Sequence, residues 1–302
     1  MYGRLDSVQC VGWASGSWAG ARYRGPVIRY TAIDDTTMRA LERHETRAHA
    51  IPGREVRDLG HAVILHDPRD ADPFWNRMAS VRWPDDQEGF DRRLTEALAL
   101  FAVLGRRPHV WPSPSHGRPV DLAARLEAHG FKASGAGHVM VLDDPVGSPP
   151  VRAGEPGRGV TLHAIRTAAD AGATDCDELA VVLVESFGAL PGRAEQLAAD
   201  LRLTLDDPRV VLVLVRVDGE PAGSAKATTF DGFTYLSSIG TRDAFRGRGL
   251  AGLATRHAMA VAGAREAGRT YLGVFSDNAP ALQLYTRLGF ASVGESPDML
   301  LG

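Results

Sequence analysis

A basic turn between a β-rich run and an alanine-rich segment carries the residue types that bind phosphate. The turn reads Arg246-Gly247-Arg248-Gly249, and residues 250–268 after it predict a helix. Glycines let a backbone approach a phosphate closely, and the first N–H groups of a helix have no partners within it. The helix dipole and the two arginines add positive charge at that end. The segment therefore predicts an anion site, and a solvated turn is the structural alternative.

Two familiar nucleotide motifs fit this turn less well. A Walker loop requires Gly-Lys-Ser/Thr, but the only lysines of the chain are Lys132 and Lys226. The glycine spacing of a dinucleotide fingerprint is present at Gly247, Gly249 and Gly252. That fingerprint also needs an acidic residue at the end of a following parallel strand, about 20 residues on. This chain lacks it.

The segments that follow indicate a different ligand. Residues 271–275 predict a short apolar strand, and residues 276–280 predict a loop that caps a helix ending at Gly289. This order resembles the GNAT superfamily of acyl-CoA N-acyltransferases. The turn from Arg246 to Ala251 matches the family's Arg/Gln-x-x-Gly-x-Gly/Ala loop. Asn278, followed by Tyr285 to Phe290, matches its Asn…Tyr-x-x-Leu-Gly-Phe ending. The resemblance covers about residues 159–302.

The resemblance implies an acetyl-CoA-dependent N-acetyltransferase without a metal. The pyrophosphate would bind backbone amides of the turn, and the pantetheine arm would pair with the strand before it. Tyr285 would protonate the leaving thiolate as general acid, or else pack its ring between helix and sheet as a core residue. The residues expected to bind the co-substrate are Ile239, Gly240, Thr241, Arg246, Gly247, Arg248, Gly249, Leu250, Ala251, Gly252 and Asn278.

A general base is not evident from the sequence. Residues 233–239 form the expected strand before the turn and contain no carboxylate or histidine. Asp231 at its entrance, an ordered water, or deprotonation before binding would serve instead. In this family the acceptor enters between the first helices and the sheet, which indicates Glu185, Phe187, Asp231 and Tyr235, with Ser186 beside them. Each also has a structural reading, as a helix-face, core or turn residue.

An internal repeat is visible at a spacing of 159 residues. Gly130-Phe131 recurs as Gly289-Phe290, and Phe74 corresponds to Phe233 at the same spacing. The chemistry does not recur, because Phe90 falls on Gly249 and Leu126 on Tyr285, and Pro84-Asp85-Asp86-Gln87-Glu88 replaces the basic turn. We therefore expect an arm over residues 1–26, a degenerate GNAT-like domain over 27–142, a Pro/Gly-rich linker over 143–158 and a catalytic domain over 159–302. The first domain should bind no acyl-CoA. It would complete the acceptor site or cover an edge of the second domain's sheet.

The resemblance implies an α/β (α+β) fold in which each unit is a mixed, mostly antiparallel sheet flanked by helices, and hydrophobic periodicity and turn residues locate its elements. In the first unit, strands are expected at residues 27–33, 60–66, 74–83 and 109–111, and helices at 35–48, 89–104 and 120–129. In the second, strands are expected at 160–165, 210–215, 221–230 and 233–239, and helices at 168–187 and 192–203.

Composition narrows the class of protein further. The chain has 302 residues, with Lys+Arg 34 against Asp+Glu 37 and a net charge of −3, so no basic excess favours a nucleic-acid partner. No apolar run reaches the roughly 20 residues that span a bilayer. Two cysteines without a disulfide pattern indicate a cytoplasmic protein. We expect a monomer or homodimer that acetylates a small amine. The alternatives are an acyl-CoA sensor or scaffold without activity, and a transferase with a longer acyl donor.

Overall fold

The structure is a computed structural model that describes residues 28–142, 157–263 and 268–302. Its strands are β1 (Glu55–Asp58), β2 (Val63–His66), β3 (Arg77–Ala79), β4 (His109–Val110), β5 (Phe131–Leu142), β6 (Val160–Ile165), β7 (Val210–Val217), β8 (Glu220–Phe230), β9 (Phe233–Thr241), β10 (Arg269–Phe275) and β11 (Phe290–Leu301). Its α-helices are α1 (Asp35–Ala48), α2 (Gln87–Val103), α3 (Leu122–Ala128), α4 (Asp175–Phe187), α5 (Ala194–Arg202), α6 (Leu250–Val261) and α7 (Ala279–Arg287).

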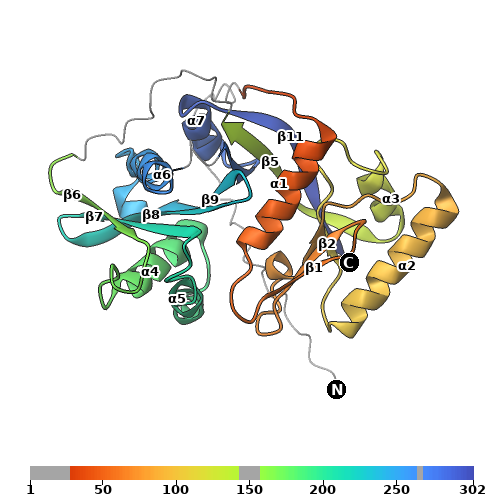
Figure 1. The fold of residues 1–302 in the computed structure, drawn as a ribbon, viewed down its shortest axis with the longest axis horizontal. Coiled ribbons are helices and arrows are strands. Elements are labelled where there is room, and N and C mark those ends of the chain that lie inside the picture. Colours follow the sequence, from red (N-terminus) through yellow and green to blue (C-terminus); the bar gives the residue numbers. More distant parts are fainter. Residues whose placement is uncertain (1–27, 143–156, 264–267) are drawn as a thin grey trace.

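One continuous sheet connects all of these strands. Their order is β1-β2-β3-β4-β11-β5-β10-β9-β8-β7-β6, and only the β3–β4 and β9–β10 pairs are parallel. The helices α2 and α3 lie at one end of the molecule and α4, α5 and α6 at the other, with α1 and the strands β5 and β11 between them (Figure 1). The predicted mixed, mostly antiparallel sheet flanked by helices is confirmed.

The element order repeats at the spacing that the sequence indicates. Adding 159 to the bounds of β5 (131 and 142) gives 290 and 301, the bounds of β11. The same shift carries β1 onto β7 and places β2 and β3 within β8 and β9. The two final strands are exchanged, because β11 pairs with β4 of the first unit and β5 pairs with β10 of the second. The first unit thus supplies β5 as the neighbour of β10 in the second unit, which is one of the two roles expected for it.

Side-chain alternation assigns the helices to the two faces of the sheet. Along β7, Val211, Val213 and Val215 pack in the cluster of α6 and α7, while Val210 and Leu212 pack against α4 and α5. Residues directly opposite in antiparallel strands share a face. Tyr235 is opposite Thr228, and Thr228 is opposite Val210, so Tyr235 lies on the α4 and α5 face. Helix α1 packs against Tyr235 and therefore covers the same face.

The two tight hairpins of the second unit fall at Asp218-Gly219 and Asp231-Gly232, each with positive φ at both positions.

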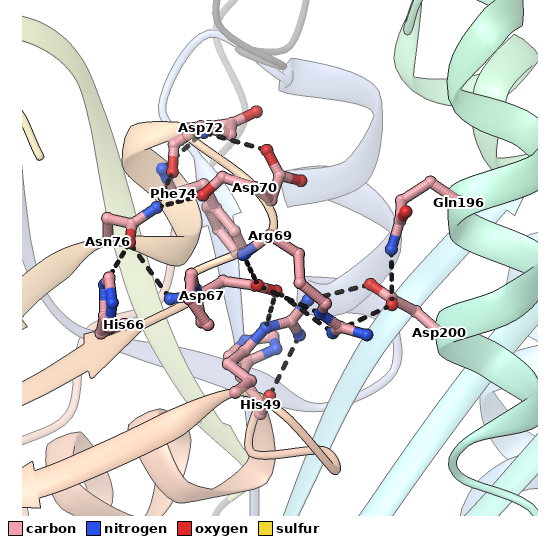
Figure 2. A network of polar contacts seen from close by, with 12 residues as sticks. His49, His66, Asp67, Arg69, Asp70, Asp72, Phe74, Asn76, Gln196 and Asp200 are labelled. Atoms are coloured by element: carbon pink, nitrogen blue, oxygen red, sulfur yellow. Dashed lines mark hydrogen bonds and ion pairs between the residues drawn. The ribbon is translucent and has the colours of Figure 1, made fainter. Parts of the chain in front are cut away.

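A buried polar network fixes the first unit against α5. The Arg54 guanidinium lies 3.0 Å from the Asp67 carboxylate and 2.9 Å from that of Asp200 on α5. Arg69 reaches the same two carboxylates, and Gln196 donates to Asp200 (Figure 2). The side chain of Asp67 has no exposed surface. Since an unpaired buried charge is costly, these pairs hold the two units in one relative position.

Several predicted elements differ from those in the structure. Residues 28–33 form no strand but only a bridge from Tyr30 to Ser292, and Val27 lies outside the described residues. The expected strand over 74–83 is a 3-10 turn, Pro73–Trp75, followed by β3, because Pro73 and the Asp72 cap favour a turn. Helix α4 begins at Asp175 rather than near 168, since the Asp170 side chain accepts two backbone N–H groups in a turn. The expected helix over 192–203 opens as a 3-10 turn, and α6 ends at Val261. The arm at 1–26 and most of the linker lie outside the described residues.

Candidate acyl-CoA and acceptor site

The strands β9 and β10 separate halfway along their length. Their parallel register runs from Arg269 opposite Phe233 to Leu272 opposite Leu236 and then stops, although both strands continue. A bulge between β8 and β9 falls at the same level, where Ser238 has a φ of 53°. The backbone of Ile239, Gly240 and Thr241 therefore has no strand partner on the β10 side among the described residues.

The basic turn follows directly from this unpaired stretch. Gly247 and Gly249 have φ of 76° and 74°, which disfavours side chains with a Cβ. Both glycines are exposed, and a Cβ built on either would have no atom within 4 Å. Gly249 precedes α6 and no side chain caps that helix. The free N–H groups from Leu250 onward are thus left for an external acceptor, as the sequence predicts for an anion site.

Glu185, at the end of α4, holds the start of this turn. One of its oxygens accepts from Arg242 Nε at 2.7 Å and the other from the backbone N–H of Asp243 at 2.8 Å. The Arg242 hydrogen bond, opposed by partial burial, lowers the pKa of Glu185. Arg246 is paired with Asp243 at 2.7 Å. Arg248, in contrast, forms no ion pair within the described part of the chain.

Two predicted site residues have structural roles in addition to any ligand contact. A Cβ at Gly252 would lie 3.1 Å from Leu284, so its small size permits the close approach of α6 and α7. A Cβ at Gly240 would lie 2.7 Å from Ser186 Oγ, so this glycine seats α4 on β9. Asn278 is the N-cap of α7, where its side chain accepts from the N–H of Ala281. Asn278 thus holds the loop at the start of α7, and its expected contact with the co-substrate stays a prediction.

Tyr285 is buried on α7 in the same cluster as Leu250, Leu272 and Leu282. Burial raises its pKa well above the ordinary value, so its hydroxyl remains protonated at neutral pH. Its ring lies edge-on to that of Phe290, with 6.1 Å between the ring centroids.

The expected acceptor residues do not gather in one place. Asp231 is at the opposite end of β9 from the turn and pairs with Arg47 at 2.6 Å. Across a nine-residue strand, this separation is roughly 25 Å. Tyr235 is buried against His49 and Tyr271, and Phe187 packs at the edge of the α4 and α5 cluster. Glu185 is engaged by the turn and Asp231 by Arg47, so neither carboxylate is free to act at the gap between the strands.

The corresponding helix of the first unit begins differently. Helix α2 is capped by Asp86, whose carboxylate accepts the N–H of Gly89 at 2.8 Å. Phe90, which replaces the second turn glycine, is fully buried, and so is Leu126 in place of the tyrosine. The negative side chain thus occupies the helix terminus that would otherwise bind an anion.

Other expected absences remain compatible with the described residues. Within residues 28–142, 157–263 and 268–302, no group of three or more His, Cys, Asp or Glu side chains could hold a metal ion. No helix in these ranges is long and apolar enough to cross a bilayer.

Comparison with known proteins supports the geometry. Residues 177–290 match the acetyltransferase (GNAT) family. Streptothricin acetyltransferase from Streptomyces lavendulae is 36% identical over 85 residues, which span 27% of this chain and 44% of that protein. A GCN5-related N-acetyltransferase from Kribbella flavida superposes with a TM-score of 0.63 at 20% identity, covering 89% of this chain and 96% of that one. A tandem GNAT protein from the clavulanic acid biosynthesis pathway gives 0.56 at 18% identity, covering 92% and 91%.

Two features of the site were missed from the sequence. The role of Glu185 in holding the turn depends on contacts across 57 residues, for which no local pattern exists. Asp298 on β11, an acidic residue beside the same face of the sheet, could not be assigned because the strand exchange is not visible in the sequence.

Proposed function

We propose that this chain, whose residues 177–290 match the acetyltransferase (GNAT) family, transfers an acetyl group from acetyl-CoA to a primary amine of a small molecule. The single observation that carries the proposal is the juxtaposition of an unpaired β9 backbone with the uncapped N-terminus of α6. The first suits an amide-bearing arm and the second a pyrophosphate. We assign the catalytic role to the second unit, residues 159–302.

The binding residues divide between two parts of the donor. The pantetheine arm would pair with the backbone of Ile239 and Thr241, near the hydroxyls of Ser186 and Thr241. These two hydroxyls are buried and have no hydrogen-bond partner among the described residues. The pyrophosphate would lie on the amides of residues 247–252. Arg248 would add charge, because its guanidinium lies 6.0 Å from the centroid of the Phe245 ring and forms no ion pair within the described residues.

The chemistry requires one bond to form and one to break. The acceptor nitrogen attacks the thioester carbonyl directly, the C–N bond forms, and the C–S bond breaks as the tetrahedral adduct collapses. Tyr285 donates its proton to the departing thiolate, and its raised pKa keeps that proton available. The amine proton leaves to water or is lost before binding, since β9 offers no carboxylate or histidine.

The test is the release of free thiol from acetyl-CoA with a panel of amines, comparing the wild type with Tyr285→Phe. We expect amine-dependent release that falls by roughly a hundredfold or more in the variant, with acetyl-CoA binding unchanged. Release that is equal in both proteins would remove Tyr285 from the mechanism.

Because β9 contains no residue that could act as general base, a function without catalysis is the alternative to acetyl transfer. A non-catalytic acyl-CoA sensor or scaffold would bind acetyl-CoA but release no thiol with any amine. A transferase for longer acyl donors, with the chain beside Ser237 and Ser238, would instead prefer those donors in competition with acetyl-CoA.

A further inference from the structure

Three glycines thin out the side chains on one face of the sheet, next to the proposed reaction centre. Gly273 lies on β10, and Gly135 and Gly137 lie on β5. The register pairs Gly273 with Val139 and Gly137 with Phe275. Since Tyr271 and Val141 on these strands pack under α1, alternation places all three glycines on the α1 face. We call these residues the glycine patch.

The glycine patch is open at Gly273, whereas atoms of Phe275 lie against Gly135 and Gly137. Gly273 is exposed although β10 lies between β9 and β5, and a Cβ built there would have no atom within 4 Å. The nearest atoms to a Cβ at Gly135 belong to Asp298 and Phe275, at 3.7 Å each. Gly273 also follows Leu272, the last β10 residue that pairs with β9. The patch thus begins where the strands separate and extends toward Asp298.

Asp298 is an unpaired carboxylate at the far side of this patch. It is partly exposed on β11, opposite Gly135, and its carboxylate has no hydrogen-bond or ion-pair partner within the described residues. Atoms of Phe275 and of the Asp298 carboxylate both lie 3.7 Å from the position of a Cβ on Gly135, so the Phe275 ring borders the carboxylate on the β10 side. On its other side, β11 pairs with β4 from Met299 onward.

The neighbouring charges are already paired with each other. Arg77 lies 4.0 Å from the Trp111 ring and 2.6 Å from the Glu45 carboxylate, which also faces His49 at 3.0 Å. Burial raises the pKa of Asp298 to about 6, with Arg77 opposing and Glu45 adding to the shift. A cation that binds Asp298 would offset this burial, because an opposite charge favours the ionised carboxylate.

We propose that Asp298 binds a second, non-reacting ammonium group of the acceptor, so that the acceptor is a diamine or polyamine. The proposal rests on the proposed function. Strand β5 separates β11 from β10, so two strand spacings, about 10 Å, lie between β11 and β10, and the gap where an amine would meet the thioester opens on the far side of β10. One ammonium group cannot occupy both places. The glycine patch gives the connecting chain a path along the sheet, and the two units both contribute to it.

The experiment measures binding rather than turnover. Full-length protein saturated with desulfo-CoA is titrated calorimetrically with diaminooctane, octylamine and aminooctanol, which differ only in the second terminal group. We expect diaminooctane to bind the wild type about tenfold more tightly than either analogue, since a charge-assisted hydrogen bond contributes that much. Asp298→Asn should abolish this preference and leave desulfo-CoA binding intact, and Asp298→Glu should restore most of it.

Glu295→Gln is the matched control, because it removes the same charge three residues away on β11, where Glu295 is exposed. It should retain the preference. A wild type without preference for the diamine would overturn the proposal, as would an Asp298→Asn variant that keeps it. Selective diamine binding without thiol release from acetyl-CoA would instead contradict the proposed function while leaving this site in place.

Discussion

At the scale of single residues, the site depends on which charged groups are already engaged. Arg246 is paired with Asp243 and Glu185 with Arg242, whereas Arg248 and Asp298 lack such partners in the described part of the chain. A group that is already paired gains less from a ligand of opposite charge. The free arginine is therefore expected to serve the donor and the free aspartate the acceptor.

Replacement of Arg248 by Ala should weaken acetyl-CoA binding by roughly fivefold to tenfold, since a phosphate loses one charge-assisted donor. The defect should shrink at high salt, because the exposed pair is screened. Arg246→Ala removes the same charge two residues away and should have a smaller effect. Equilibrium titration with acetyl-CoA at two ionic strengths measures both. Equal losses of acetyl-CoA affinity in the two variants would show that the pairing of Arg246 with Asp243 does not reduce its contribution to binding.

At the scale of elements, two helices with corresponding positions begin in opposite ways. Helix α6 starts after Gly249 without a side-chain cap, while α2 starts with the Asp86 carboxylate on its N–H groups. The uncapped terminus gives up stability that a cap would provide and leaves its donors available. The capped terminus is stable but already occupied by a negative group.

Asp86→Ala should therefore lower the free energy of unfolding by about 1 kcal/mol, the usual contribution of a cap. Acetyl-CoA binding should not change. Asp121→Ala is a suitable comparison, because Asp121 precedes α3 without a side-chain cap hydrogen bond and should cost less. Urea denaturation measures the stabilities. A gain of a second acetyl-CoA site in Asp86→Ala would show that the cap alone excludes the donor from the first unit.

The turn and its helix could be predicted because their signals are local. The glycines at 247 and 249 and the apolar run after them indicate strand, turn and helix from neighbouring residues alone. The repeat was also visible, since Gly130-Phe131 and Gly289-Phe290 recur. The exchange of β5 and β11 could not be predicted, because either strand could pair with its own unit and both are apolar enough for it. Asp298 was missed for that reason. The strand that contains β3 was predicted to be too long, because Phe74 and Trp75 favour a strand by residue type, whereas Pro73 places both in a 3-10 turn.

At the scale of the whole molecule, the two units share one sheet and a buried polar interface. Arg54 and Asp67 are almost completely buried, and Arg54 also reaches Asp200 across the interface. Replacement of Arg54 by Met should cost about 3 kcal/mol of unfolding free energy, because Asp67 would keep only Arg69. Arg202→Met removes an exposed pair with Asp177 and should cost less than about 1 kcal/mol. Thermal unfolding distinguishes them, and equal costs would contradict the structural role of the network.

The buried histidines of the first unit should make stability depend on pH. Burial lowers the pKa of His49 to about 4, against the opposing effect of Glu45, and burial lowers that of His109 to about 4 as well. In the unfolded chain these groups bind protons near pH 6.5, so the unfolded state takes up more protons between pH 6.5 and 4. Stability should be complete above 6.5 and fall as the pH drops through this window. Urea midpoints at pH 7.5 and 5 measure this, and His109→Gln should reduce the decline. Equal midpoints would show that the histidines are not buried as neutral groups.

The most direct test of the account is a crystal structure with acetyl-CoA at saturating concentration. We predict one bound molecule per chain, with its pyrophosphate on the amides of residues 247–252, its pantetheine beside Ile239 and Thr241, and its sulfur near the Tyr285 hydroxyl. The N-terminus of α2 should carry no density for the donor. Acetyl-CoA bound at α2, or absent from the gap between β9 and β10, would contradict the assignment of the catalytic role to the second unit.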